Sequence, residues 1–179
     1  MLFRSIAPEN IAQARQQERA LLQFAVHDMR QPIEAPPFDA VLNLFTSFGY
    51  FDNESEHQAA LHTMASALKP NGVLVIDYLN VDNVRANLVP LEEVEINRIR
   101  FTIRRKESAT QFIKEITVED PAMKQPLHFE ETVAKFQQAD FERMLSKEDL
   151  KIRAALGDYS LNAYDPVQSP RLILIAERR

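Results

Sequence analysis

Acidic, amide and aromatic side chains gather at the points where three predicted strands end. The strands are the apolar runs at residues 22–26, 38–45 and 73–76. The side chains that close or follow them are Asp28, Met29, Asn43, Leu44, Phe45, Asp77 and Tyr78. Ligands of parallel α/β sheets bind outside the carboxyl ends of the strands, so we expect these side chains to converge on one crevice.

Aromatic residues are concentrated around the end of the second of these strands. Ring faces attract positive charge and a nearby carboxylate can fix a polar ligand edge, so such a crevice suits a partly apolar cation. Alternatively, the rings form the core around a turn at Gly49, and residue types alone leave both interpretations open. The residues concerned are Phe45, Phe48, Tyr50, Phe51 and Tyr78.

A strand–helix–strand unit positions two of the three strand ends. Residues 38–45 are almost continuously apolar, which is typical of a strand covered on both faces. Asn53 and Glu56 have the spacing of a capping box that begins a helix, and residues 69–72 (KPNG) carry helix stop signals. The strand at residues 73–76 follows, so the unit is expected to be parallel and right-handed.

Residues from about 95 to 136 alternate between polar and apolar types. Period-two alternation gives a strand one solvent-exposed face, so we predict an antiparallel β meander set apart from the parallel sheet. Its arginine stripe could bind an acidic ligand, but cross-strand pairing with carboxylates is the favoured interpretation. The residues concerned are Arg98, Arg100 and Arg104, opposite Glu115 and Glu119.

Composition excludes several kinds of site. The three glycines, Gly49, Gly72 and Gly157, are too far apart to form a loop that cradles phosphate. The chain has no cysteine, which excludes thiolate zinc sites, disulfides and cysteine nucleophiles. His57 and His62 are five residues apart on a predicted helix and do not share a face, so no metal is expected.

The chain has 179 residues and a formal charge of −5, with 45% hydrophobic residues. This length and composition favour one globular domain over residues 1–179. The mildly acidic balance argues against a nucleic-acid surface, and no run is long and apolar enough to span a membrane. Together with the lack of cysteine and of a signal peptide, these features suggest a cytoplasmic protein.

Several segments, taken in order, resemble the class I S-adenosylmethionine-dependent methyltransferases of the small-molecule type. The resemblance implies an α/β fold with a Rossmann-like sheet. Any one segment is a weak signal, but the ordered set covers nearly the whole chain. The segments are APENIAQAR at 7–15, Asp28-Met29-Arg30, FDAVLNLFTSFGYF at 38–51, LKPNGVLVIDYLN at 68–80, FEETV at 129–133, Gly157-Asp158-Tyr159 and Ser169-Pro170-Arg171.

The resemblance also implies roles for individual residues. On the donor side, S-adenosylmethionine would contact Ser5 at the ribose, Asp28 and Met29 at the adenine, and Asn43, Leu44 and Phe45 at the methionine end. On the acceptor side, a small molecule would contact Phe48, Tyr50 and Asn80, and the meander at about residues 95–136 would be an insertion that covers this site. Methyl transfer needs orientation more than strong acid–base groups, and the candidate orienting groups or bases are Tyr50, Asp77 and Tyr78.

Relative to the family, the sequence starts at or just after the second strand, so the first strand and the glycine-rich donor loop are not matched. Because the first strand is central in the family, both of its neighbours would expose ladder edges. We therefore expect residues 1–26 to be poorly ordered, re-paired or completed by another chain. A homo-oligomer through these edges is a further expectation.

The leading hypothesis is a methyltransferase-like protein that methylates a small molecule, inactive if the chain is truncated. The second hypothesis is a non-catalytic binding or oligomerisation module that retains the fold. A hydrolase is disfavoured because the sequence has no GxSxG elbow. Near the C-terminus, Arg171 is expected to satisfy a carboxylate such as Asp158.

Overall fold

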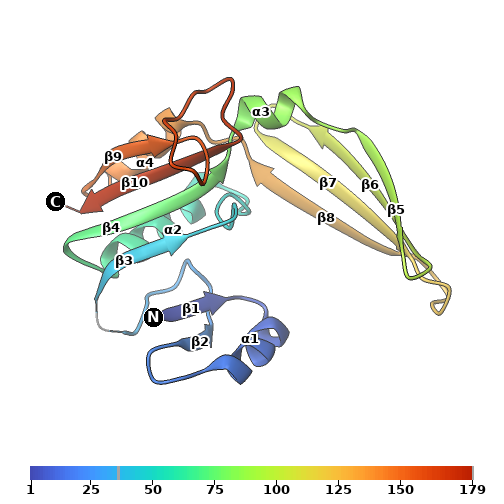
Figure 1. Cartoon of the computed structure of the whole chain (residues 1–179), viewed down its shortest axis with the longest axis horizontal. Coiled ribbons are helices and arrows are strands. Elements are labelled where there is room, and N and C mark those ends of the chain that lie inside the picture. The colour runs from blue at the N-terminus through green and yellow to red at the C-terminus, as the bar shows by residue number, and fades with distance from the viewer. Residues whose placement is uncertain (36, 179) are drawn as a thin grey trace.

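The computed structural model describes residues 1–35 and 37–178 and divides the strands among three sheets (Figure 1). The main sheet has the order β3-β4-β10-β9. Strands β3 and β4 are parallel, whereas β10 runs antiparallel to both of its neighbours. The strands are β3 (Phe38–Asn43), β4 (Leu68–Leu79), β9 (Leu150–Leu156) and β10 (Arg171–Arg178).

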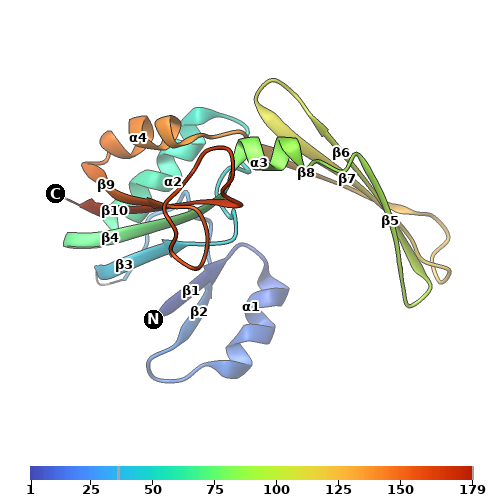
Figure 2. The ribbon, with the colours of Figure 1, turned by 45° about the horizontal axis from the view of Figure 1, so that its top comes forward.

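Helices α2 (Glu54–Ser66) and α4 (Gln138–Ser146) lie on the same face of the main sheet (Figure 2). The strand–helix–strand unit predicted from the sequence is therefore confirmed, with parallel pairing of β3 and β4. The Asn53 side chain accepts a hydrogen bond from the Glu56 amide at 3.0 Å, which is the expected helix cap. Residues 69–72 do not stand between helix and strand as expected, because β4 already begins at Leu68.

The core lies between this pair of helices and the sheet. It contains Leu61 and Met64 of α2, Phe141 and Met144 of α4, and side chains of β4 and β10 such as Leu74. Each of these is less than 5% exposed. Buried Leu or Met side chains contribute about 1.5–3 kcal/mol each, so this layer supplies most of the apolar stabilisation.

Two of the aromatic residues expected around a crevice belong to this core. Phe48 and Tyr78 are completely buried and pack edge to face, with ring centroids 6.5 Å apart. Phe45 and Tyr50, in contrast, are 75% and 48% exposed. The structure thus answers the question that residue types left open: the aromatic run is partly core and partly accessible surface.

A second sheet has the order β5-β6-β7-β8 and is antiparallel throughout. It follows the short helix α3 (Val81–Ala86) and starts before residue 95, where the meander was expected to begin. Arg100 pairs with Glu119 across β6 and β7 at 3.7 Å, so the structural interpretation of the arginine stripe is confirmed there. The strands are β5 (Leu91–Ile96), β6 (Ile99–Glu107), β7 (Gln111–Glu119) and β8 (Leu127–Ala134).

The N-terminal residues form a small unit of their own. Strands β1 (Leu2–Ser5) and β2 (Gln23–Val26) pair in parallel, with α1 (Pro8–Ala14) and a 3-10 turn (Arg15–Gln17) between them. Residues 1–26 are therefore paired with each other and do not join the main sheet.

This separation changes the environment of β3. The sequence predicted that β3 is covered on both faces, but Leu42 is 57% exposed. In the described part of the chain, β3 is the edge strand of the main sheet and only β4 pairs with it. Because α2 and α4 lie on the same face of the sheet, the other face of β3 is left partly open to solvent (Figure 2).

The described residues include no helix that is long and apolar enough to cross a membrane.

His57 provides a test of the core by pH. It is 3% exposed among Phe48, Phe51 and Phe136, and burial lowers the pKa of its imidazole below the ordinary 6.5. The folded state therefore holds His57 neutral, while the unfolded chain binds a proton below about pH 6.5. Stability should be fully present above that pH and be lost progressively as the pH falls.

Urea unfolding between pH 7.5 and 5 measures this dependence. His57→Gln, which cannot titrate, should flatten the slope of unfolding free energy against pH. His128→Gln, which removes an exposed imidazole that has no ion pair among the described residues, is the control. An unchanged slope in His57→Gln would mean that His57 does not cause the acid sensitivity.

Candidate functional site

The ends of β3 and β4 meet as the sequence predicted. Asn43 lies opposite Ile76 in the parallel register, and the Phe45 amide donates to the Asp77 carboxylate at 2.8 Å. The Asn43 Nδ2 atom lies 3.9 Å from the sulfur of Met29. The structure therefore brings Met29, Asn43, Phe45 and Asp77 into one connected group.

The turn after β3 is strained. Phe45 and Thr46 have φ angles of 58° and 56°, in the left-handed region that residues with a side chain seldom adopt. Such conformations cost about 1–3 kcal/mol each, so the surroundings must hold them in place. Strain of this kind clusters at functional sites, and here it turns the Phe45 ring out into solvent.

Asp77 and Arg171 hold this turn. The Asp77 carbonyl accepts from the Thr46 amide at 3.0 Å, and Arg171 donates to the Thr46 hydroxyl at 2.9 Å. Arg171 also pairs with the Asp77 carboxylate at 2.7 and 2.8 Å. Both ends of the strained segment are therefore tied to one ion pair.

The Asp77 carboxylate is fully engaged. It is 1% exposed and accepts from Phe45, from Arg171 and from the Tyr159 hydroxyl at 2.9 Å. The expectation that Arg171 pairs with Asp158 is wrong, since Asp158 accepts instead from Asn162 within its own turn. The buried Asp77 carboxylate needs a counter-charge, and the half-buried Arg171 supplies it.

Asn43 carries an unsatisfied atom. The residue is 7% exposed, and its Oδ1 atom has no hydrogen-bond partner among the described residues. A buried acceptor without a partner costs about 1–3 kcal/mol. Asn43 is thus a candidate binding residue of the connected group.

Asp28 is placed beside this group but is tied to Arg30. Arg30 donates to both carboxylate oxygens, with Nη2 at 2.6 Å, and these hydrogen bonds lower the pKa of the Asp28 carboxyl. Arg30 also contacts Glu56 and lies over the Phe51 ring at 5.0 Å. Asp28 therefore stays ionised, and any further donor at this carboxylate would share its oxygens with Arg30.

Three predicted acceptor-side residues lie in the core rather than on a surface. Phe48 packs among aromatic rings, and Asn80 caps α3 while it donates to the Ser169 carbonyl at 2.7 Å. The Tyr78 hydroxyl donates to the Ala134 carbonyl at 2.6 Å, and burial raises its pKa. Gly49 permits this arrangement, since a Cβ there would lie 2.2 Å from the Tyr78 hydroxyl.

Ser5 and Leu44, also predicted to contact the donor, form hydrogen bonds with residues close to them in sequence. The Ser5 hydroxyl accepts from the Ala7 amide at 3.2 Å, at the end of β1. Leu44 is half-buried, and its carbonyl accepts from the Ser47 hydroxyl at 2.6 Å. Ser5 is thus in the N-terminal sheet, whereas Leu44 lies in the connected group beside Asn43.

A cavity of about 510 Å³ adjoins the strained turn. It lies between α3, the start of the antiparallel sheet and the Thr46 turn, and Tyr50 forms part of its wall. Burial and the nearby Glu131 raise the pKa of Tyr50, which therefore stays protonated at neutral pH.

Sequence reasoning identified Tyr50 in this cavity but missed most of its other walls. Period-two alternation of the meander was the available signal, since it places alternate residues of β7 and β8 on the cavity side. The additional lining residues include Thr46, Asn83, Asn87, Arg105, Phe112, Lys114, Glu131 and Val133.

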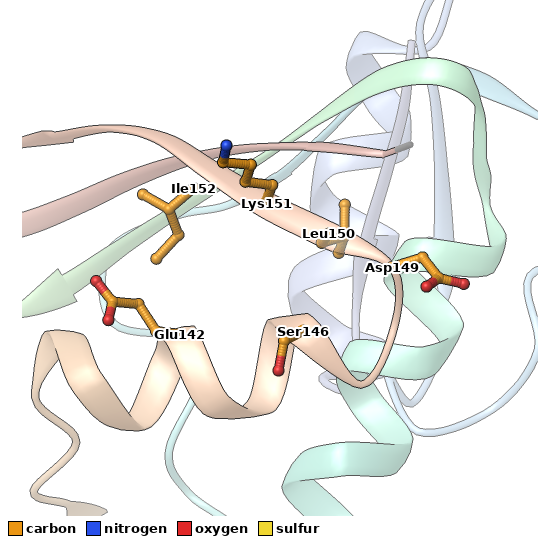
Figure 3. Close-up of a pocket in the computed structure, with 6 residues that line it drawn as sticks. All are labelled: Glu142, Ser146, Asp149, Leu150, Lys151 and Ile152. Atoms are coloured by element: carbon orange, nitrogen blue, oxygen red, sulfur yellow. The ribbon is translucent and has the colours of Figure 1, made fainter.

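A second cavity, of about 340 Å³, lies between α4 and β9 (Figure 3). Its wall includes Leu150, which pairs with Arg178 at the far end of β10 from Arg171. The second cavity therefore lies at the far end of the strands from the carboxyl ends of β3 and β4. Figure 3 shows Glu142 and Ser146 on the helix and Lys151 on the strand, with no converging polar cluster.

Within the described ranges, no group of three or more histidine or acidic side chains is placed to hold a metal ion.

Comparison with known proteins agrees with this geometry. The family model described as "Methyltransferase domain" matches residues 5–76. A solved S-adenosylmethionine-dependent methyltransferase from Clostridium acetobutylicum superposes with a TM-score of 0.83 at 14% identity. The match covers 99% of this chain and 74% of that one. A structure of an amino pentose methyltransferase from Micromonospora echinaspora superposes with a TM-score of 0.70 at 18% identity, with coverages of 99% and 73%.

The chain therefore resembles S-adenosylmethionine-dependent methyltransferases in sequence over residues 5–76 and in fold over nearly its whole length. A curated relative is the dTDP-3-amino-3,4,6-trideoxy-alpha-D-glucopyranose N,N-dimethyltransferase of Streptomyces venezuelae, 29% identical over 133 residues. The match covers 70% of this chain and 55% of the relative. Glycine N-methyltransferase of Rattus norvegicus is 43% identical over 51 residues, or 26% of this chain and 17% of that protein. The chain thus spans about half the length of the first relative and less of the second.

The strain in the turn after β3 can be measured directly. Phe45→Gly should stabilise the protein by about 1 kcal/mol, because glycine adopts a positive φ without steric cost and the lost ring is 75% exposed. The free energy of unfolding in urea measures the change.

Leu42→Gly is the matched control. Leu42 is also an exposed apolar residue, but it lies within β3, where glycine should destabilise by about 0.5–1 kcal/mol. If both substitutions destabilise equally, the turn stores no strain.

Proposed function

We propose that the protein transfers a methyl group from S-adenosylmethionine to an amine nitrogen of a small molecule. The observation that carries the proposal is that Thr46 joins the connected group at the strand ends to the cavity. Thr46 belongs to the strained turn beside Asn43 and Asp77, and it also lines the 510 Å³ cavity. A group-transfer reaction needs two adjoining ligand sites of this kind.

Asn43, Phe45, Met29 and Asp28 would hold the donor. The unsatisfied Asn43 oxygen would accept from the donor's ammonium group, and Asp28 would accept from its adenine amino group. The exposed Phe45 ring would cover the sulfonium, since ring faces attract cations. The donor supplies an electrophilic methyl group when bound.

The cavity would hold the acceptor. Apolar side chains such as Phe112 and Val133 exclude water, and Tyr50 with Glu131 supplies polar groups. Tyr50 stays protonated and would orient the attacking nitrogen by a hydrogen bond, whereas Glu131 would attract a cationic amine and take up its proton. The names of the curated relatives, both N-methyltransferases, support an amine as the acceptor.

Asp77 and Tyr78 receive different roles from those that the resemblance implied. The Asp77 carboxylate has no free position for a substrate proton, so we propose that it positions the Phe45–Thr46 turn. Tyr78 and Asn80 would support the site from the core.

The donor site is incomplete within the described residues. Strands β1 and β3 each have one unpaired ladder edge, and the solved relatives are longer than this chain. We propose that full donor affinity requires a further strand between β1 and β3, where the glycine loop of the family would lie.

Calorimetric titration with S-adenosylmethionine tests the donor site. Asn43→Leu should weaken donor binding about tenfold while leaving stability unchanged or higher, because it removes a buried oxygen that has no partner. Asn10→Leu, at an exposed position on α1, is the control. Equal donor affinities of Asn43→Leu and the unsubstituted chain would remove Asn43 from the donor site.

Transfer of a labelled methyl group to amino sugars and amino acids tests the acceptor site. Tyr50→Phe should lower kcat about 10- to 100-fold with little change in donor affinity, because only acceptor orientation is lost. His62→Gln should leave kcat unchanged. Equal rates for Tyr50→Phe and the unsubstituted protein would remove Tyr50 from the mechanism.

A further inference from the structure

The β5–β8 sheet has one apolar face, which we call the meander face. Directly opposed residues of antiparallel strands lie on the same face, so the register defines its members. Phe129, Ile116 and Ile103 form one row across the sheet, and Leu127, Val118 and Phe101 form the next. The face is completed by Val94, Ile96 and Ile99.

The opposite face of the same sheet is polar. Its rows contain Arg100 with Glu119 and Arg104 with Glu115, together with threonines and further glutamates. The sheet is therefore amphipathic, with one face suited to water and one suited to burial.

No layer of the described chain covers the outer part of the meander face. The sheet extends away from the rest of the fold, and only its inner end approaches α3 and the cavity (Figure 2). Ile96, Leu127 and Phe129 are 55%, 40% and 52% exposed, and none of the other six residues of the face is buried. A sheet normally buries its apolar face against another layer, so a partner is needed.

We infer that the meander face packs against the same face of a second copy of this chain. The outer rows of the face carry only apolar side chains, apart from Glu92 at one end, so the partner must be equally apolar. Two identical sheets related by a two-fold axis satisfy this condition, in the aligned packing of β-sandwiches. An anionic membrane fits less well, because the outer rows present no lysine or arginine.

The meander face is of moderate size for an interface. Its nine residues occupy about five positions along the strands, or about 17 Å, and four strands span about 19 Å, which gives a plane of about 320 Å². Side-chain relief increases the accessible area above that of the plane, so the face fits a dimer at the small end of interface sizes, below the about 800 Å² that each partner buries in a standard interface.

The inferred dimer differs from the edge-to-edge oligomer that the sequence suggested. It uses a sheet face, leaves the open edges of β1 and β3 free, and does not depend on the proposed methyltransferase activity. The face is continuous with the inner row of Arg105, Lys114 and Glu131, which lines the cavity. A second copy would therefore lie close to the mouth of the acceptor cavity.

Sedimentation equilibrium of the full chain tests this inference. The unsubstituted protein should have the mass of two copies at micromolar concentration, and Phe129→Glu should raise the dissociation constant at least 100-fold. Leu91→Glu is the control, because Leu91 is a 46% exposed apolar residue of the same sheet on the polar face. A monomeric unsubstituted protein, or equal effects of the two substitutions, would overturn the proposal.

Cross-linking provides a second readout that does not depend on the charged variants folding. The chain has no cysteine, so Ile116→Cys and Thr117→Cys each introduce one thiol on neighbouring residues that point to opposite faces. A bis-maleimide with a spacer of about 10 Å, the distance between packed sheets, should link Ile116→Cys into dimers and leave Thr117→Cys monomeric. The reverse pattern, or linkage of both variants, would contradict the assignment of the face.

Discussion

The arrangement at the strand ends depends on the ion pair between the buried Asp77 and the half-buried Arg171. It joins the end of β4, the start of β10, the turn after β3 and the loop that carries Tyr159. Each partner would be costly to bury alone, so the pair is stable only as a unit. By binding both Phe45 and Thr46, it maintains a backbone conformation that the turn would not adopt by itself.

A second constraint is the division of the strands among three sheets. The main sheet has a compact core beneath α2 and α4, but β3 is its edge, and the β1–β2 unit stands apart. The antiparallel sheet covers one cavity at its inner end and leaves an apolar face open beyond it. The unpaired backbone groups at the edge of β3 favour pairing with a further strand. The uncovered apolar side chains of the antiparallel sheet favour packing against a further layer.

Much of the fold could be predicted because it rests on local patterns. The cap at Asn53, the parallel β3–α2–β4 unit and the alternation of the meander follow from residue types at fixed spacing. The convergence of Asn43, Phe45 and Asp77 followed from a topological rule about parallel strands. The cavity walls could not be predicted, because Thr46, Phe112 and Glu131 come from segments that are far apart in sequence.

By itself, the sequence determined the helices and strands and the three strand ends where polar and aromatic residues gather. These features depend on the spacing of apolar and polar residues that are close together in the chain. It could not distinguish a core aromatic from an exposed one, or a free carboxylate from an engaged one. Only the tertiary structure determined that Tyr78 is buried, that Phe45 is exposed and that Asp77 forms an ion pair with Arg171 and is not free to contact a substrate. Burial and ion pairing depend on contacts between distant segments, and those contacts exist only after the chain has folded.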